Sequence, residues 1–145
     1  MAKFKAAAVF SSNMVIQRDK NVKVFGTGSN GESVIVSFCG NTAVAEVKDE
    51  KWSVVLPAMK AGGPYEMKIS NGEDTIVFSN VMIGEVWLAG GQSNMELELQ
   101  NCLGGKDYLA NDKEPNVRYY YTQKNCNMDE KFFLDEENTG WSCFD

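Results

Sequence analysis

The sequence of 145 residues contains no histidine. Histidine is the general base of Ser-His-Asp and Cys-His catalysts, and it is a common metal ligand. Its absence therefore excludes a self-contained catalyst of either kind within this sequence. A histidine-ligated metal site and a histidine pH switch are excluded for the same reason.

Cysteine and long apolar runs are also scarce. The four cysteines are too far apart for a CxxC metal or redox motif, so we expect reduced, partly buried thiols. They are Cys39, Cys102, Cys126 and Cys143. The N-terminus lacks an apolar run of signal-peptide length, and no stretch approaches the roughly 18 residues of a membrane span. We expect a soluble, cytoplasmic chain that does not contact a membrane.

Positive charge is in short supply. The net charge is −6 and the pI is about 4.7, whereas a nucleic-acid-binding surface must neutralise phosphates, so no nucleic-acid partner is expected. Residues 1–83 carry nine basic and eight acidic side chains, and residues 84–145 carry five and twelve. This uneven distribution predicts a domain boundary near Gly84.

Residues 1–83 are typical of an all-β sandwich domain, because short runs with period-two apolar patterns alternate with Gly or Asn-Gly turns. The expected strands are Asn21–Thr27, Glu32–Cys39, Thr42–Val47, Trp52–Leu56, Tyr65–Ile69 and Asp74–Ile83. The side chains that share a face within a run are Val34, Val36 and Phe38; Ala43, Ala45 and Val47; Trp52, Val54 and Leu56; and Tyr65, Met67 and Ile69. We expect these strands to pair antiparallel.

One glycine motif in this half has two interpretations. Gly26–Gly31 matches G-x-G-x-x-G, the dinucleotide-binding pattern, and Asp49 follows at a suitable distance. That site requires a helix after the glycines to hold the pyrophosphate. A strand pattern begins at Ser33 instead, so we interpret the motif as a hairpin turn.

The pattern changes at Gly84. Glu85–Ala89 is a short apolar run that predicts a strand buried on both faces of a parallel sheet. Asn94–Asn101 reads as a short helix that stops at Gly104–Gly105, and Asn116–Thr122 reads as a second strand. Strand, helix and strand form one βαβ unit, so residues 84–145 are the incomplete start of an α/β domain.

Ser93 lies at the predicted strand-to-helix junction and also has two interpretations. With Glu96 three residues later it matches a capping box, in which Ser93 is only the helix N-cap. Alternatively its hydroxyl lies at the carboxyl edge of a parallel sheet, where such folds bind ligands. The α/β-hydrolase elbow G-x-S-x-G does not apply, because Met95 replaces the second glycine.

Gly84–Met95 (GEVWLAGGQSNM) resembles the first conserved block of the SGNH, or GDSL-like, hydrolases, and in particular the sialate O-acetylesterase family. Phe10–Arg18, Lys51–Pro57 and Ala61–Tyr65 are similar to the β-domain that precedes the catalytic domain in that family. At Ala89-Gly90 the chain departs from the Cys-Ser that the family often shows.

The resemblance implies that Ser93 is the nucleophile that attacks an acetyl ester of a carbohydrate, without metal or organic cofactor. Its backbone N–H would be one oxyanion donor, within a region formed by Gly91, Gln92 and Asn94. The other oxyanion donors and the Asp-x-x-His block of the family have no counterpart here. We therefore expect this chain to be an inactive part of a longer esterase whose substrate is an O-acetylated carbohydrate.

Three alternatives remain open. The chain is a non-catalytic carbohydrate-binding or interaction module if Ser93 is only a helix cap. The acidic residues form paired carboxylates for glycoside hydrolysis or, as we expect, a solvated loop; they are Asp129, Glu130, Asp135, Glu136 and Glu137. The aromatic residues stack on sugars or, as we expect, pack in the core and on strand faces; they are Trp52, Tyr65 and Tyr119–Tyr121.

Overall fold

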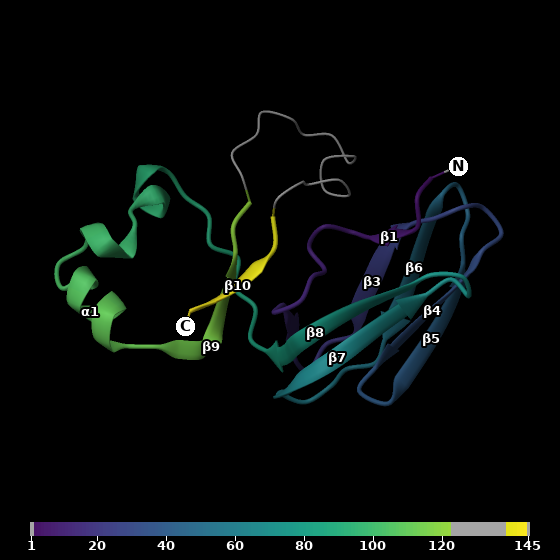
Figure 1. Cartoon of the computed structure of the whole chain (residues 1–145), viewed down its shortest axis with the longest axis horizontal. Coiled ribbons are helices and arrows are strands. Elements are labelled where there is room, and N and C mark those ends of the chain that lie inside the picture. Colours follow the sequence, from purple (N-terminus) through teal and green to yellow (C-terminus); the bar gives the residue numbers. More distant parts are fainter. Residues whose placement is uncertain (1, 123–138, 145) are drawn as a thin grey trace.

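The computed structural model describes residues 2–122 and 139–144, which are mostly β-structure (Figure 1). The strands are β1 (Lys5–Ala6), β2 (Val15–Gln17), β3 (Val22–Thr27), β4 (Ser33–Phe38), β5 (Asn41–Glu46), β6 (Lys51–Leu56), β7 (Gly62–Ser70), β8 (Thr75–Gly84), β9 (Glu114–Tyr120) and β10 (Trp141–Phe144). The helical elements are the 3₁₀ turns η1 (Ser93–Glu96) and η2 (Leu99–Asn101) and the helix α1 (Gly105–Asn111). None of these helices is long and apolar enough to cross a membrane.

Residues up to Gly84 form two sheets. One has the strand order β1-β3-β6 and the other the order β2-β8-β7-β4-β5. The all-β prediction for this half is confirmed. The expectation of purely antiparallel pairing is wrong at one edge, where β2 runs parallel to β8. β1 and β2 have two and three residues, which is too short for a period-two pattern to reveal them.

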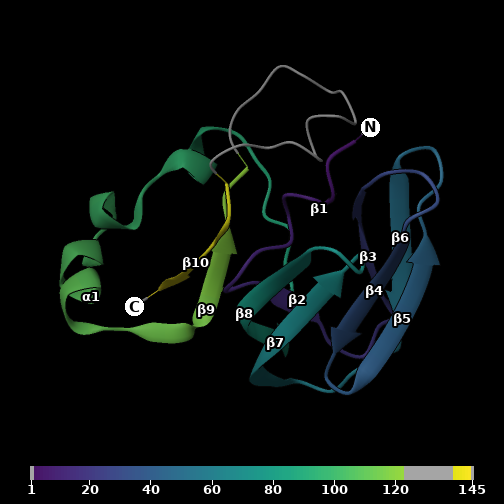
Figure 2. The same ribbon diagram turned by 45° about the vertical axis from the view of Figure 1, so that its right-hand side comes forward.

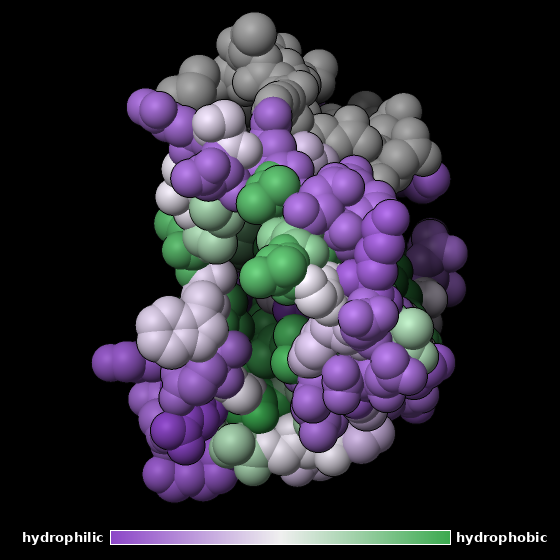
Figure 3. Space-filling model, turned by 90° about the vertical axis from the view of Figure 1, so that its left-hand side faces the viewer, coloured by the Kyte–Doolittle hydropathy of each residue, from purple (hydrophilic) through white to green (hydrophobic). Residues whose placement is uncertain are grey.

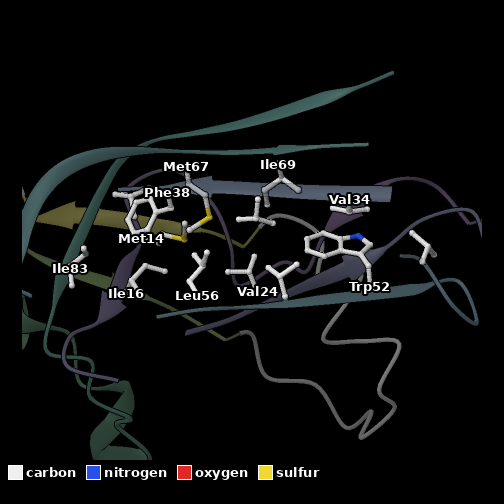
Figure 4. Packing of buried hydrophobic residues seen from close by; sticks show 14 residues of the cluster. Met14, Ile16, Val24, Val34, Phe38, Trp52, Leu56, Met67, Ile69 and Ile83 are labelled. Atoms are coloured by element: carbon white, nitrogen blue, oxygen red, sulfur yellow. The ribbon is translucent and has the colours of Figure 1, made fainter. Parts of the chain in front are cut away.

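A single apolar core lies between the two sheets (Figure 4). The predicted inward faces of β4 and β6 are confirmed, because every second side chain in these strands is buried. Tyr65 is an exception: it is exposed, while Met67 and Ile69 on the same strand are buried. The pairing of β7 with β8 is irregular between Tyr65 and Met67, and such an irregularity breaks the alternation of faces.

The hairpin interpretation of Gly26–Gly31 is wrong. β3 pairs with β1 and β6, whereas β4 pairs with β5 and β7, so the glycine segment crosses from one sheet to the other. A strand follows it, which removes the helix N-terminus that a pyrophosphate site needs. Gly26 has a packing role instead: a Cβ atom there would overlap the carbonyl oxygen of Lys5 and lie 2.7 Å from Cζ2 of Trp52.

The predicted βαβ unit after Gly84 is not found among the described residues. Glu85–Ala89 forms no strand, and 94–101 is two 3₁₀ turns rather than one helix. Gly104 precedes α1 with a left-handed φ of 74°, so the predicted helix stop is a helix start. The expected second strand is present as β9, but it pairs antiparallel with β10. An apolar run becomes a central strand only between two hydrogen-bonding neighbours, and no described residue supplies them.

Candidate functional site

Ser93 is the first residue of η1 and lies nine positions after the end of β8. The backbone N–H of Met95 donates to the carbonyl of Gln92 at 2.9 Å, which closes the first turn. Gln92 occupies the N-cap position, and no side chain caps the turn. The capping interpretation of Ser93 therefore does not fit this geometry. Among the described residues, no hydrogen bond involves the Ser93 hydroxyl.

Gly91 leaves room for the side chain of Met95. A Cβ atom at Gly91 would lie 2.7 Å from Cγ of Met95, so any other residue would push the Met95 side chain away. Gly90 has no such constraint, since a Cβ there would meet nothing within 4 Å. In this motif the Met95 side chain packs against Gly91. The three residues between them, Gln92, Ser93 and Asn94, are exposed to solvent.

The segment that carries Ser93 displays apolar side chains to solvent. Trp87 and Leu88 have relative exposures of 86% and 101%, and Leu103 is equally exposed. Figure 3 shows the face of the molecule on which this segment lies, with apolar surface gathered in its middle between hydrophilic regions. Exposed apolar surface of this kind is typical of an interaction site.

Ser93 has no catalytic partner within the part of the chain that the structure describes. No histidine exists in the sequence, and the described residues contain no group of three or more acidic, cysteine or histidine side chains that could hold a metal. A serine hydroxyl without a base is almost fully protonated at neutral pH and is a weak nucleophile. The arrangement provides an accessible serine hydroxyl and, among the described residues, nothing that activates it.

The start of this segment is held by Gln17 and Arg18, at the end of β2. Arg18 Nε donates to Oε1 of Glu85 at 2.6 Å, and Gln17 Nε2 donates to Oε2 at 3.1 Å. Gln17 also accepts, through Oε1, the backbone N–H of Val86 at 2.9 Å. The hydrogen bonds from Gln17 and Arg18 lower the pKa of Glu85 below its ordinary value of 4.5. The backbone pairing of β2 with β8 stops at Gln17 and Gly84. The Gln17 side chain then binds the next two residues, Glu85 and Val86.

Sequence reasoning assigned no role to the side chains of Phe10–Arg18. The sequence does contain a signal for such a role. The polar run Ser11-Ser12-Asn13 interrupts an otherwise apolar stretch that ends with Gln17-Arg18. Polar side chains at such positions are typical of a segment that hydrogen-bonds to another part of the chain.

The aromatic candidates divide between core and surface. Trp52 is buried, and its Nε1 donates to the carbonyl of Thr27 at 2.9 Å, so its core role is confirmed. Tyr65 packs edge-on against Phe38. Tyr119 and Tyr121 are exposed. The acidic residues between 129 and 137 lie outside the described residues.

The thiol prediction is confirmed in part. Cys102 and Cys143 are free and half-buried, as expected, whereas Cys39 is free but exposed. Cys39 stands in the turn between β4 and β5 with a left-handed φ of 49°, and connecting turns of this kind lie on the protein surface. Cys126 lies outside the described residues.

Comparison with known proteins places the chain beside carbohydrate esterases. No protein-family model matches it. It is 29% identical to the sialate O-acetylesterase of Mus musculus over 96% of this chain, and 31% identical to that of Homo sapiens over 74% of it. The crystal structure of a carbohydrate acetylesterase from Xanthomonas citri superposes with a TM-score of 0.89 and 29% identity over 96% of the chain. The chain spans 28% of the mouse protein, 23% of the human protein and 32% of the bacterial one.

Proposed function

We propose, from its homology to sialate O-acetylesterases and to a solved carbohydrate acetylesterase, that this chain is part of an enzyme that removes acetyl groups from carbohydrates. Its substrate would be an O-acetylated sugar such as a sialate. The observation that carries the proposal is the Gly91–Met95 turn, which presents an exposed serine hydroxyl in a chain homologous to acetylesterases over 96% of its length.

The proposed reaction is acyl transfer through Ser93. Its Oγ attacks the acetyl carbonyl while its proton passes to a base, the sugar hydroxyl leaves, and water then hydrolyses the acetyl-serine. The backbone N–H of Ser93, within the region of Gly91, Gln92 and Asn94, would stabilise the oxyanion. Because the sequence contains no histidine, a histidine base would have to come from residues outside these 145. In this proposal residues 1–83 are a β-domain, and residues 84–145 begin an SGNH-type catalytic domain.

The proposal is supported by the length relationship as well as by Ser93. The curated relatives are more than three times as long as the part of them that this chain matches. Their remaining length leaves room for the base and for strands on either side of Glu85–Ala89. The exposed side chains of Trp87 and Leu88 are the groups that such strands and their covering helices would bury.

Fluorophosphonate labelling of the protein produced from its complete gene tests the proposal. We expect one adduct, on the peptide that contains Ser93, and none after Ser93→Ala. Ser53→Ala is the matched control, since Ser53 is also an exposed serine and its loss should leave the adduct in place. Absence of an adduct on Ser93 would favour the alternative, a non-catalytic carbohydrate-binding or interaction module. The 145 residues alone should hydrolyse p-nitrophenyl acetate no faster than their Ser93→Ala variant.

A further inference from the structure

The segment 86–113, which carries Ser93, is attached to the β-sheets at both ends by the short stretch of chain Val9–Arg18, with Asn80 of β8 contributing to the second attachment. We infer that Val9–Arg18 is a positioning element for Ser93, and we call it the anchor segment. This inference rests on the proposed function, because a position matters for catalysis only if Ser93 reacts. The attachment itself is a matter of geometry, and it is independent of that chemistry.

The first attachment precedes Ser93. Gln17 and Arg18 hold Glu85 and Val86 through the contacts described above. In addition, the backbone N–H of Arg18 donates to the carbonyl of Gly84 at 2.9 Å. Three consecutive residues that leave β8 are thus bound by two consecutive residues of the anchor segment, which sets the direction in which the chain leaves the sheet.

The second attachment follows Ser93 and centres on Arg118 of β9. Its guanidinium donates from Nη1 to the carbonyl of Asn13 at 3.2 Å and to the carbonyl of Asn80, and from Nη2 to Oδ1 of Asn80 at 3.0 Å. Asn13 and Asn80 both have left-handed φ values, of 69° and 55°. Their side chains also bond to each other, from Nδ2 of Asn80 to Oδ1 of Asn13 at 2.8 Å. The planar guanidinium of Arg118 therefore binds Asn13 and Asn80 at the same time.

Strand β10 adds to the second attachment. The backbone N–H of Trp141 donates to Oγ of Ser11 at 3.1 Å, and its indole Nε1 donates to the carbonyl of Val9 at 2.8 Å. Figures 1 and 2 both show the β9–β10 pair between the two sheets and α1. The β9–β10 pair therefore joins the anchor segment to the helical part of the chain.

A continuous series of contacts leads from this pair back toward Ser93. The ring of Tyr108 in α1 stacks on Phe144 of β10, with centroids 5.8 Å apart and an interplanar angle of 11°. Gly105, the only buried residue of α1, lies against η2 so closely that a Cβ there would overlap the carbonyl oxygen of Leu99. Leu99 lies six positions after Ser93 in the sequence, so this series of contacts ends six positions from the serine.

A chain fixed at both ends samples far fewer conformations than a chain fixed at one end. Catalysis by a nucleophile depends on orientation, and a misplacement of about 1 Å can cost about a hundredfold in rate. The two attachments are on opposite sides of Ser93 in sequence and on the same anchor segment in space. This arrangement suits a β-domain that fixes the position of the reacting serine.

Distances between paired spin labels test the inference. The labels are placed at Cys39, which is exposed in the β4–β5 turn, and at position 93 through Ser93→Cys, with the other three cysteines replaced by serine. Cys39 and Ser53→Cys form the control pair, because Cys39 lies in the β4–β5 turn and Ser53 in β6, both outside the segment 86–113. The test substitutions are Arg118→Gln and Gln17→Ala, and Lys113→Gln is the matched control for loss of one positive charge.

We expect one narrow distribution of the distance between labels at positions 39 and 93. Arg118→Gln or Gln17→Ala should make this distribution about twofold broader, and Lys113→Gln should leave it unchanged. Arg118→Lys, which retains the charge and can donate to fewer acceptors, should restore part of the narrowing. The control pair should stay narrow throughout. Three results would overturn the inference. The distance distribution is already broad before substitution, it does not change in either variant, or it broadens equally in the control pair. Since the label replaces Ser93, failure here and failure of fluorophosphonate labelling are separate results.

Discussion

Arg18 and Glu85, 67 positions apart in sequence, form an ion pair with Nε and Oε1 at 2.6 Å where β2 and β8 end side by side. Both side chains are about half exposed. The pair joins the sheets to the segment that carries Ser93, so its protonation state affects that junction directly.

We predict that the stabilisation from Glu85 is lost at low pH. Hydrogen bonds from Gln17 and Arg18 lower the pKa of Glu85 in the folded chain below 4.5. As the pH falls, Glu85 is therefore protonated in the unfolded chain before it is protonated in the folded chain. The contribution is therefore complete above about pH 4.5 and is lost as pH falls through the lowered folded-state pKa. The difference in thermal midpoint between the unsubstituted chain and Glu85→Gln should shrink from pH 7 to pH 3. It should also shrink in 1 M salt; a difference that is independent of pH would contradict the prediction.

The core of the sheets predicts a contrast between two neighbouring residues. Leu56 is fully buried and Val55 is 59% exposed on the opposite face of β6. Leu56→Ala leaves a cavity and should lower the free energy of unfolding by about 2–5 kcal/mol. Val55→Ala should cost less than about 1 kcal/mol. Urea unfolding followed by circular dichroism measures both, and equal losses would mean that β6 does not face the core as described.

β1 approaches β3 so closely at Gly26 that there is no space for a side chain at this position. A methyl group there overlaps the carbonyl oxygen of Lys5, and lies 2.8 Å from Cα of Ala6, so relief requires the backbone to move. We expect Gly26→Ala to cost about 1–3 kcal/mol or more. Gly90→Ala, where a methyl group meets nothing within 4 Å, is the control and should leave the urea midpoint unchanged.

Removal of the Ser93 hydroxyl should leave stability unaltered. A serine that caps a helix contributes about 1 kcal/mol, but Gln92 holds the N-cap position of η1. We therefore expect Ser93→Ala to change the free energy of unfolding by less than about 0.5 kcal/mol. A loss near 1 kcal/mol would restore the capping interpretation and weaken the case for a nucleophile.

Exposed apolar residues predict self-association of the 145-residue chain. The side chains of Trp87 and Leu88 are almost entirely in solvent, and contiguous apolar surface of this kind promotes aggregation. Light scattering at tens of micromolar should show species larger than a monomer, and Trp87→Ser with Leu88→Ser should reduce them. Val55→Ser is the control, since it removes an exposed apolar side chain from a sheet face. A monodisperse monomer before substitution would contradict the prediction.

The strands of residues 1–83 could be predicted because their signal is local. In β4 and β6 each second side chain enters the core, and a period of two is readable in six residues. The partners of those strands could not be predicted, since Gly26–Gly31 reads equally well as a hairpin or as a crossover between sheets. β2 was missed because its pairing with β8 depends on a contact between residues about 67 positions apart.

For the candidate site, the sequence by itself determined that Ser93 lies in a specific glycine-rich motif and that no histidine accompanies it. It also indicated an apolar run at Glu85–Ala89, but not whether that run pairs. Only the tertiary structure decided that Gln92 holds the N-cap position, that Gly91 accommodates Met95, and that Arg118 binds Asn13 and Asn80. Motifs and absences are properties of neighbouring residues, whereas the attachment of Ser93 depends on hydrogen bonds between groups that only folding brings within 3 Å or so of each other.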